Sequence, residues 1–255
     1  MEKYVQNDVK KSRKMTALIL ILLIVIITTV AVVIMTKERE TEAVELAIDG
    51  SKISEDEFLQ AIDTVKYDVT SYFISQYNAD IGGDFWTRDY EGDVPCRKLA
   101  EAAVEELRYR YAVYAVAEEK GYLERMSYAD KQKYLEQLNE ERKAAKEAGE
   151  VIYGLVEYSM EQYLDYELNQ VEEAYCNDSS NADMEVADEE ARKYYESNGD
   201  MINESGEIIP LDTVRSAVDN EIRQLRYAEM IEERAESLKV EADEEQLFAF
   251  IVNHI

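Results

Sequence analysis

One stretch near the N-terminus constrains this chain more than any other. Residues 15–36 read MTALILILLIVIITTVAVVIMT and hold no charged side chain. A helix rises about 1.5 Å per residue, so this stretch would be about 33 Å long, and the hydrocarbon core of a bilayer is about 30 Å thick. A helix this long that is apolar on every side has no polar face to turn toward water. The sequence therefore predicts a transmembrane helix over 15–36.

The charges beside this stretch predict its orientation. Residues 1–14 hold more basic than acidic side chains, whereas the following KERETEAVE is mixed and soon acidic. The positive-inside rule then makes 1–14 a cytoplasmic tail and 37–255 an extracellular domain of a single-pass cell-membrane protein. The alternative is a cleaved signal peptide, which would have a shorter apolar region ending in small residues. Either reading leaves the domain outside the cytoplasm.

Composition limits the partners and the fold of the domain. The chain has 28 basic and 56 acidic residues, a net charge of −28. Binding to phosphates needs clustered Lys and Arg, so nucleic acid is excluded as a partner. Only 9 Gly and 2 Pro interrupt the chain. Scarce helix breakers predict a mainly α-helical fold with one or two short strands.

Local patterns place the first elements of the domain. Residues 44–49, VELAID, alternate apolar and polar side chains, which predicts a short strand, and Gly50 permits a turn after it. Ser54 and Glu57 have the spacing of a capping box that opens a helix. That helix has an apolar face formed by Phe58, Ile62, Val65 and Val69.

Later helices follow from apolar side chains recurring every three or four residues. The longest such stripe runs from Val214 to Leu238 and predicts a final long helix that packs back on the earlier ones. The polar segment 177–183, NDSSNAD, is a hinge candidate, and a short strand is predicted at 207–209. The helices are expected over about 95–120, 127–148, 155–176, 186–198 and 211–239, with a last element at 243–252.

Side chains suited to catalysis or metal binding are few. Cys96 and Cys176 form no CxxC motif, and the single His is His254 at the chain end. We therefore expect no metal and no cofactor, while a disulfide between the two cysteines stays open. Acidic neighbours such as Glu105 and Glu106 point about 100° apart on a helix, so they indicate a solvated face. No motif for a nucleophile or phosphate loop occurs, and we expect no catalytic residue and no enzyme.

Two motifs in this order resemble the chaperone domain of the SurA/PrsA/trigger-factor group of extracytoplasmic foldases. The first is IDGSKISEDEF over 48–58, and the second is AEEKG over 117–121. Residues 186–196 and 213–239 resemble the helices that flank the parvulin isomerase domain in that group. The interval between them is too short for a parvulin domain and holds no His. The resemblance therefore implies a foldase-like chaperone without the isomerase, and residual prolyl isomerase activity has no support in the residues.

Two functions follow as hypotheses. The first is a membrane-anchored chaperone, in a Gram-positive bacterium, that holds unfolded exported polypeptides. The alternative is a non-catalytic scaffold that binds one membrane or cell-envelope partner. The oligomeric state stays open. Client-binding candidates are apolar and aromatic side chains, which could instead fill the domain's own core: Phe58, Ile62, Phe85, Trp86, Tyr90, Tyr111 and Tyr114.

Overall fold

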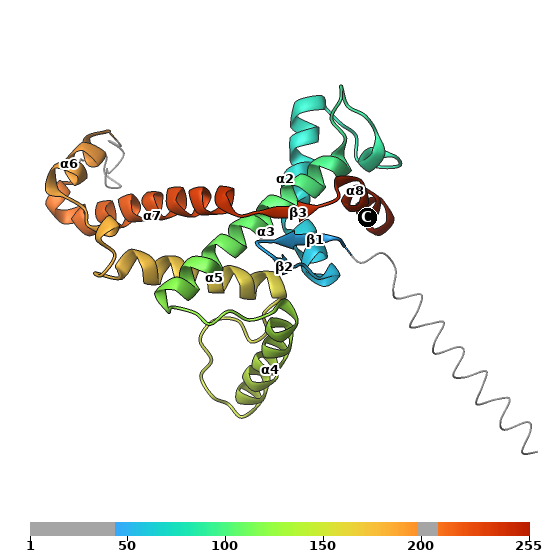
Figure 1. Cartoon of the computed structure of the whole chain (residues 1–255). Helices are drawn as coiled ribbons and strands as arrows, with labels where there is room; N and C mark the ends of the chain where they lie inside the picture. Colours follow the sequence, from blue (N-terminus) through green and yellow to red (C-terminus); the bar gives the residue numbers. More distant parts are fainter. Residues whose placement is uncertain (1–43, 198–208) are drawn as a thin grey trace, which may run out of the picture. The chain divides into compact units, whose positions relative to one another are not determined.

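A computed structural model describes residues 44–197 and 209–255 of the chain. These residues form seven α-helices, two short 3-10 helices and one small sheet, so the predicted mainly α-helical class is confirmed (Figure 1). The elements in chain order are β1 (Leu46–Ile48), β2 (Ser51–Lys52), α2 (Glu55–Tyr77), η1 (Phe85–Thr87), α3 (Pro95–Lys120), α4 (Tyr128–Glu147), α5 (Met160–Asn177), η2 (Ala182–Met184), α6 (Asp188–Ser197), α7 (Leu211–Ser237), β3 (Val240–Ala242) and α8 (Glu244–His254).

The sheet joins the two ends of the described chain. Its strand order is β2-β1-β3, and both pairings are antiparallel. Gly50, at φ +76°, lies in the tight turn between β1 and β2, where a left-handed backbone favours glycine. Beside β3, the N–H of Asp49 donates to the carbonyl of Lys239 at 2.8 Å. The sequence predicted β1 but not β3, because the partner of β3 lies at the other end of the domain in sequence.

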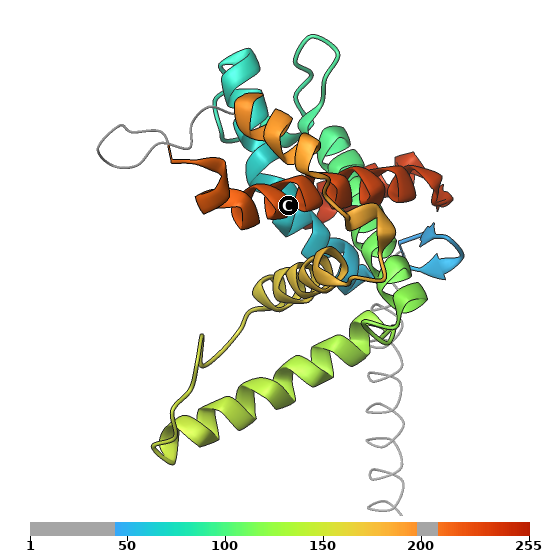
Figure 2. The ribbon, with the colours of Figure 1, turned by 90° about the vertical axis from the view of Figure 1, so that its left-hand side faces the viewer.

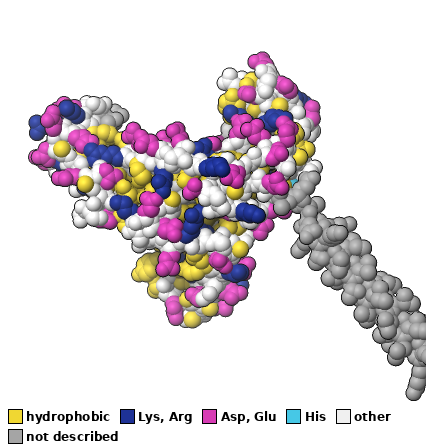
Figure 3. All heavy atoms as spheres, viewed as in Figure 1, with side chains coloured by type: hydrophobic (Ala, Val, Ile, Leu, Met, Phe, Trp, Pro, Cys, Tyr) yellow, Lys and Arg dark blue, Asp and Glu magenta, His cyan; other side chains and the backbone are white. Residues whose placement is uncertain are grey.

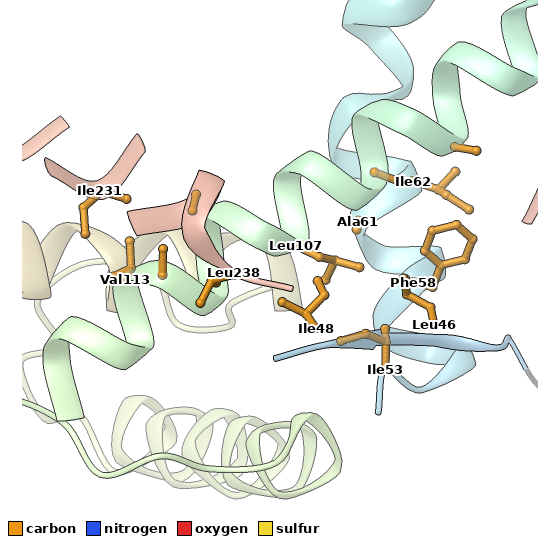
Figure 4. Close-up of a cluster of buried hydrophobic side chains, with 14 of the residues drawn as sticks. Leu46, Ile48, Ile53, Phe58, Ala61, Ile62, Leu107, Val113, Ile231 and Leu238 are labelled. Carbon is orange, nitrogen blue, oxygen red and sulfur yellow. The ribbon is translucent and has the colours of Figure 1, made fainter. Parts of the chain in front are cut away.

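The core lies where α2, α3 and the sheet meet. Phe58 and Ile62 of α2 pack with Leu107 of α3 and Ile48 of β1, and all four are at most 2% exposed (Figure 4). The ring of Phe58 also lies 5.6 Å from that of Phe250 in α8. Burying each such side chain stabilises the fold by roughly 1.5–3 kcal/mol.

Capping residues fix where the helices begin and end. Ser54 accepts a hydrogen bond from the N–H of Glu57 at 3.2 Å, so the predicted start of α2 is confirmed. Gly121, in the left-handed region, ends α3 as predicted. Helix α5 begins later than expected, at Met160. The reason is the complete capping box that Ser159 and Gln162 form, which starts the helix at that point.

Helix α7 packs on α3 and α5 (Figure 2). The prediction that the final long helix packs on the earlier ones is therefore confirmed. Val218, Ile222 and Ile231 of the predicted stripe are buried. Leu225 belongs to the same stripe but is 58% exposed. Tyr227, two residues further along the helix, is buried in its place. The guanidinium of Arg108 in α3 then donates to two carbonyls of the last turn of α7, at 2.9 and 3.0 Å.

The membrane prediction needs correction. Across the described ranges 44–197 and 209–255, no helix combines the length and the apolar character needed to cross a bilayer. The long helices carry charged side chains within them, for example Arg108 and Arg110 in α3. The predicted span 15–36 and the tail 1–14 lie outside the described residues. The expected single-pass placement in the cell membrane has no support in the described residues and is not retained.

The hinge candidate 177–183 is tied to the end of α3 by hydrogen bonds. Tyr122 donates to Asp178 at 2.6 Å, and Lys120 donates to the side chain of Asn181 at 2.6 Å. Asn181 is buried and donates to the carbonyl of Tyr175 at 2.9 Å. Movement about this segment stays a prediction, and it would require these bonds to break. The strand predicted at 207–209 lies mostly outside the described residues.

Asp178 makes this attachment sensitive to acid. Hydrogen bonds from the Tyr122 hydroxyl and from the main-chain N–H of Ser180 lower the pKa of Asp178 from 3.8 to about 2. Its ionised form therefore stabilises the fold above pH 3.8, and this contribution is lost as the pH falls toward 2. We predict that Asp178→Asn lowers the free energy of unfolding at pH 6, and that its difference from the natural protein shrinks between pH 4 and 2.

Urea unfolding at several pH values measures this difference. Glu173→Gln, which removes an exposed carboxylate from α5, is the matched control and should show no such narrowing. An Asp178→Asn difference that is unchanged from pH 6 to pH 2 would contradict the assignment.

Candidate functional site

The structure places the predicted client-binding side chains in two separate regions. Phe58 and Ile62 lie in the core, and Phe85 is also buried. Trp86 and Tyr90 are partly buried around Phe85. Their role in client binding stays a prediction, and all five lie in or against one hydrophobic core.

An aromatic cluster surrounds Phe85. Its ring lies 4.9 Å from Trp86 and 6.1 Å from both Phe73 and Tyr90. Tyr77 donates to Asp93 at 2.6 Å, which fastens the end of α2 to the loop that carries the cluster. The loop between α2 and α3 thus covers the end of α2 with its own aromatic rings.

Tyr111 and Tyr114, the two remaining candidates, lie at the base of a second feature. We call residues 128–159, which are α4 and the loop after it, the arm. Helix α4 is highly charged, and among its residues only Lys131 and Leu135 are buried. Leu135 packs with Tyr163 and Leu164 of α5. The arm therefore depends on few side chains for its attachment.

A buried ion pair makes the central contact at the base of the arm. Lys131 is 4% exposed and pairs with Glu167 of α5, which is 8% exposed. Glu167 also accepts hydrogen bonds from Tyr114 at 3.1 Å and from Tyr163 at 2.8 Å. The ammonium of Lys131 lies 4.1 Å from the centre of the Tyr114 ring. One carboxylate thereby joins α3, α4 and α5.

Burial shifts the pKa values of these groups. Desolvation lowers the pKa of Lys131, although Glu167 partly opposes the shift. Desolvation and the nearby Glu167 carboxylate raise the pKa values of Tyr114 and Tyr163. Both hydroxyls therefore stay protonated at neutral pH and donate to Glu167. Desolvation also raises the pKa of Glu57, which accepts a bond from Tyr111 at 3.3 Å.

Shifted pKa values often mark catalytic sites, but this cluster has no room for a substrate. The cavity beside Glu57, Arg110 and Lys131 holds about 20 Å³. That is about the space of one water molecule. The geometry therefore supports attachment of the arm rather than chemistry.

Polar side chains of α4 fix the loop 148–159 against the helix. The side-chain amide of Asn139 donates to the carbonyl of Tyr158 at 2.9 Å and accepts from its N–H at 2.9 Å. Arg142 donates to the carbonyls of Leu155 at 2.7 Å and Tyr153 at 2.5 Å. Its guanidinium also lies 5.2 Å from the centre of the Tyr158 ring. The main chain of the loop is thus held in one conformation.

This fixed loop presents apolar side chains to solvent. Val151 is 79% exposed, Tyr153 is 85% exposed and Leu155 is 46% exposed. Tyr134 of α4 and Tyr166 of α5 are about half exposed on neighbouring elements. Hydrophobic side chains also show at the surface of this region in the space-filling view, at the bottom of Figure 3. Single exposed apolar residues are ordinary, but several of them on one ordered segment make this loop a candidate binding surface.

Sequence reasoning did not find this surface. It ended a charged helix at about 148, placed residue 155 inside the next helix and left 149–154 as a connection between them. The signal was the run VIYGLV over 151–156, which follows Gly149 and contains Gly154. Both glycines adopt φ +80°, so the backbone turns here and cannot continue as a helix.

Comparisons with known proteins give one curated relative. It is named as a chaperone for lacto-N-biosidase, from Bifidobacterium longum subsp. longum, and it is 36% identical over 169 residues. The match covers 66% of this chain, and the chain spans 60% of the length of that relative. No protein-family model matches the chain.

A solved structure, the GH136 lacto-N-biosidase from Eubacterium ramulus, is a weak structural neighbour. Its TM-score is 0.44 at 19% identity, and the alignment covers 57% of this chain and 30% of that one. A likeness of this size supports no argument about fold or function.

The predicted resemblance to SurA/PrsA-type foldases is wrong. The curated relative is a chaperone named for one enzyme. The motifs that suggested a foldase have a local explanation. Ser54 and Glu57 start a helix and Gly121 ends one, which are signals that unrelated helical proteins share.

The ion pair at the base of the arm gives a stability prediction. Lys131→Met alone leaves the Glu167 carboxylate buried without its cation, and Glu167→Gln alone leaves the ammonium buried. We expect each to lower the free energy of unfolding by about 3–5 kcal/mol. The double variant Lys131→Met/Glu167→Gln keeps an acceptor for Tyr114 and Tyr163, and should recover much of that loss in urea unfolding. Additive losses in the double variant would contradict a direct pairing.

A second prediction concerns the conformation of the loop. A Cβ atom at Gly154 would lie 2.8 Å from the Tyr158 hydroxyl oxygen, in a backbone conformation that favours glycine. Gly154→Ala should therefore loosen the loop and raise hydrogen exchange of the amides over 150–158. Gly149→Ala is the control, since it has the same φ but open space around the new Cβ. Equal exchange in the two variants would show that contact with Tyr158 does not matter.

Proposed function

We propose that this protein is a chaperone for one enzyme, a lacto-N-biosidase, and is not itself an enzyme. The observation that carries the proposal is the 36% identity to a chaperone named for that enzyme. This identity extends over 169 residues, or 66% of the chain, so it does not rest on one motif. The proposal replaces a general holder of unfolded exported chains with a chaperone of one defined partner.

The surface of the arm supports a single partner. A chaperone for many clients benefits from a flexible apolar surface that can repack. Here Asn139 and Arg142 fix the loop, so Val151 and Tyr153 are presented in one arrangement. A surface ordered before binding loses less conformational entropy when the partner docks. A pre-ordered group of apolar side chains therefore fits one complementary surface better than many.

In the proposed mechanism, the arm loop covers an apolar surface of the enzyme, either transiently or permanently. Val151, Tyr153 and Leu155 would bury against the folding enzyme and keep that surface from aggregating. Aromatic anchors such as Tyr153 supply large contact areas and hydrogen-bonding capacity at once. The buried pair of Lys131 and Glu167 would hold the arm at a fixed angle during binding.

Co-expression tests this function. The lacto-N-biosidase of the organism that makes this chain is expressed with and without the full chain, and lacto-N-biosidase activity is measured in the soluble fraction. We expect activity to rise several-fold with the chain present, and Val151→Ser/Tyr153→Ser to remove most of that rise. Tyr67→Ser on α2 is the matched control, because Tyr67 is 78% exposed but lies off the arm.

Two outcomes would contradict the proposal. One is equal enzyme activity with and without the chain. The other is suppression of aggregation of unrelated unfolded proteins as effectively as of the biosidase, which would indicate a general chaperone. If Tyr67→Ser and the arm variant reduce the gain in enzyme activity equally, the arm has no specific role in the mechanism.

A further inference from the structure

The outer edge of the small sheet is open. Strand β3 pairs with β1 on one side only, in the register Ala47↔Glu241 and Ile48↔Val240. Since the N–H of Asp49 donates to Lys239, the hydrogen-bonded pairs alternate along this register and include Glu241. The N–H and C=O groups of Val240 and Ala242 therefore point away from β1. No other described strand pairs with this edge.

A groove runs beside the open edge. It has a volume of about 350 Å³ and lies between α3, β3 and α8. The last turn of α7 leads into β3 and is fixed by Arg108, so the strand is held in place beside the groove. Its apolar lining comes from Ala100, Val104, Val240, Ala242, Leu247 and Phe248.

Charges on the rim of the groove are uneven. Arg97 already has a partner, because it forms a salt bridge with Glu245 at 3.0 Å. Its guanidinium also lies 4.6 Å from the centre of the Phe248 ring. Glu101 and Glu244 also line the groove, and neither has an ion pair within the described residues. The rim therefore offers two free carboxylates and no free cation in the part of the chain that is described.

We propose that β3 and this groove bind an extended segment of the partner enzyme. The segment would add a strand to the sheet through the outward N–H and C=O groups of Val240 and Ala242. One apolar side chain would enter the groove, and a Lys or Arg beside it would pair with Glu101 or Glu244. The inference rests on the proposed function for the identity of the partner, and it adds a second contact site apart from the arm loop.

The charge argues for a different chain rather than a second copy. The chain has a net charge of −28. Pairing of two β3 edges would bring the free carboxylates of Glu101 and Glu244 close to those of the other copy, which is unfavourable. A basic segment of another protein removes this repulsion and gains from the same carboxylates.

Removal of one outward N–H tests the strand pairing. Ala242→Pro deletes the N–H that faces the open edge and leaves the pairing of Glu241 with β1 in place. The dissociation constant is measured with purified full-length chain and purified partner enzyme. We expect Ala242→Pro to weaken binding and so raise this constant about tenfold. Ala242→Ser keeps the N–H and should bind as the natural protein does. Urea unfolding of both variants checks that the fold is retained.

Charge reversal tests the rim. Glu101→Lys/Glu244→Lys should slow association and weaken binding about tenfold, with a smaller dependence on salt. Glu101→Lys/Glu118→Lys makes the same change in net charge with only one substitution at the groove, and should lose less. Hydrogen exchange of the amides over 239–243 should fall when the enzyme is added.

The outcomes separate this inference from the proposed function. If the natural chain does not assist the enzyme at all, the proposed function fails. If it assists, but Ala242→Pro and the charge reversal bind normally and the β3 amides are not protected, this inference alone fails. If the β3 amides of the free chain become protected as its concentration rises, together with sedimentation as a dimer, the occupant is a second copy and the inference is overturned.

Discussion

The packing of α2 against α3 is the constraint on which the rest of the structure depends. These helices carry large buried side chains such as Phe58 and Leu107, and the other core elements pack around them. Strand β1 covers one end through Ile48, and α7 covers the far end of α3. The last residues of the chain then return as β3 and α8, so that Phe250 meets Phe58. The first and last elements of the described residues thus lie in one core although they are far apart in sequence, and both contribute to its stability.

The arm follows a different physical rule. Its helix buries little apolar surface beyond Leu135, so a desolvated ion pair contributes a large part of its attachment. Such a pair adds little net stability, because the loss of hydration offsets the attraction between Lys131 and Glu167. Its geometry is specific, however, since Glu167 must also accept from two tyrosines. This combination is suited to fixing the direction of an exposed element, for which position matters more than stability.

Local signals in the sequence predicted much of the fold and little of the candidate surface. Ser54 and Gly121 marked helix ends because capping is decided by a few neighbouring residues. Strand β3 escaped prediction because its partner, β1, lies at the other end of the domain in sequence. The same limit applies to Lys131, which looks like one more charge on a charged helix until Glu167 is brought to it. The resemblance to foldases failed for a related reason, since capping signals report helix boundaries and carry no information about function.

The arm loop and the open edge of β3 differ in the recognition that each can provide. The loop offers side chains in a fixed arrangement, so it selects the shape of a surface. The edge offers main-chain groups that any extended segment could satisfy, and specificity there must come from the groove and its carboxylates. A partner that engages both must carry a folded apolar surface and an exposed extended segment at once. An enzyme that has not completed folding meets both conditions, whereas a fully unfolded chain lacks the first and a finished enzyme ordinarily lacks the second. If both proposed contacts form, the two surfaces together would select a late stage of folding of the partner.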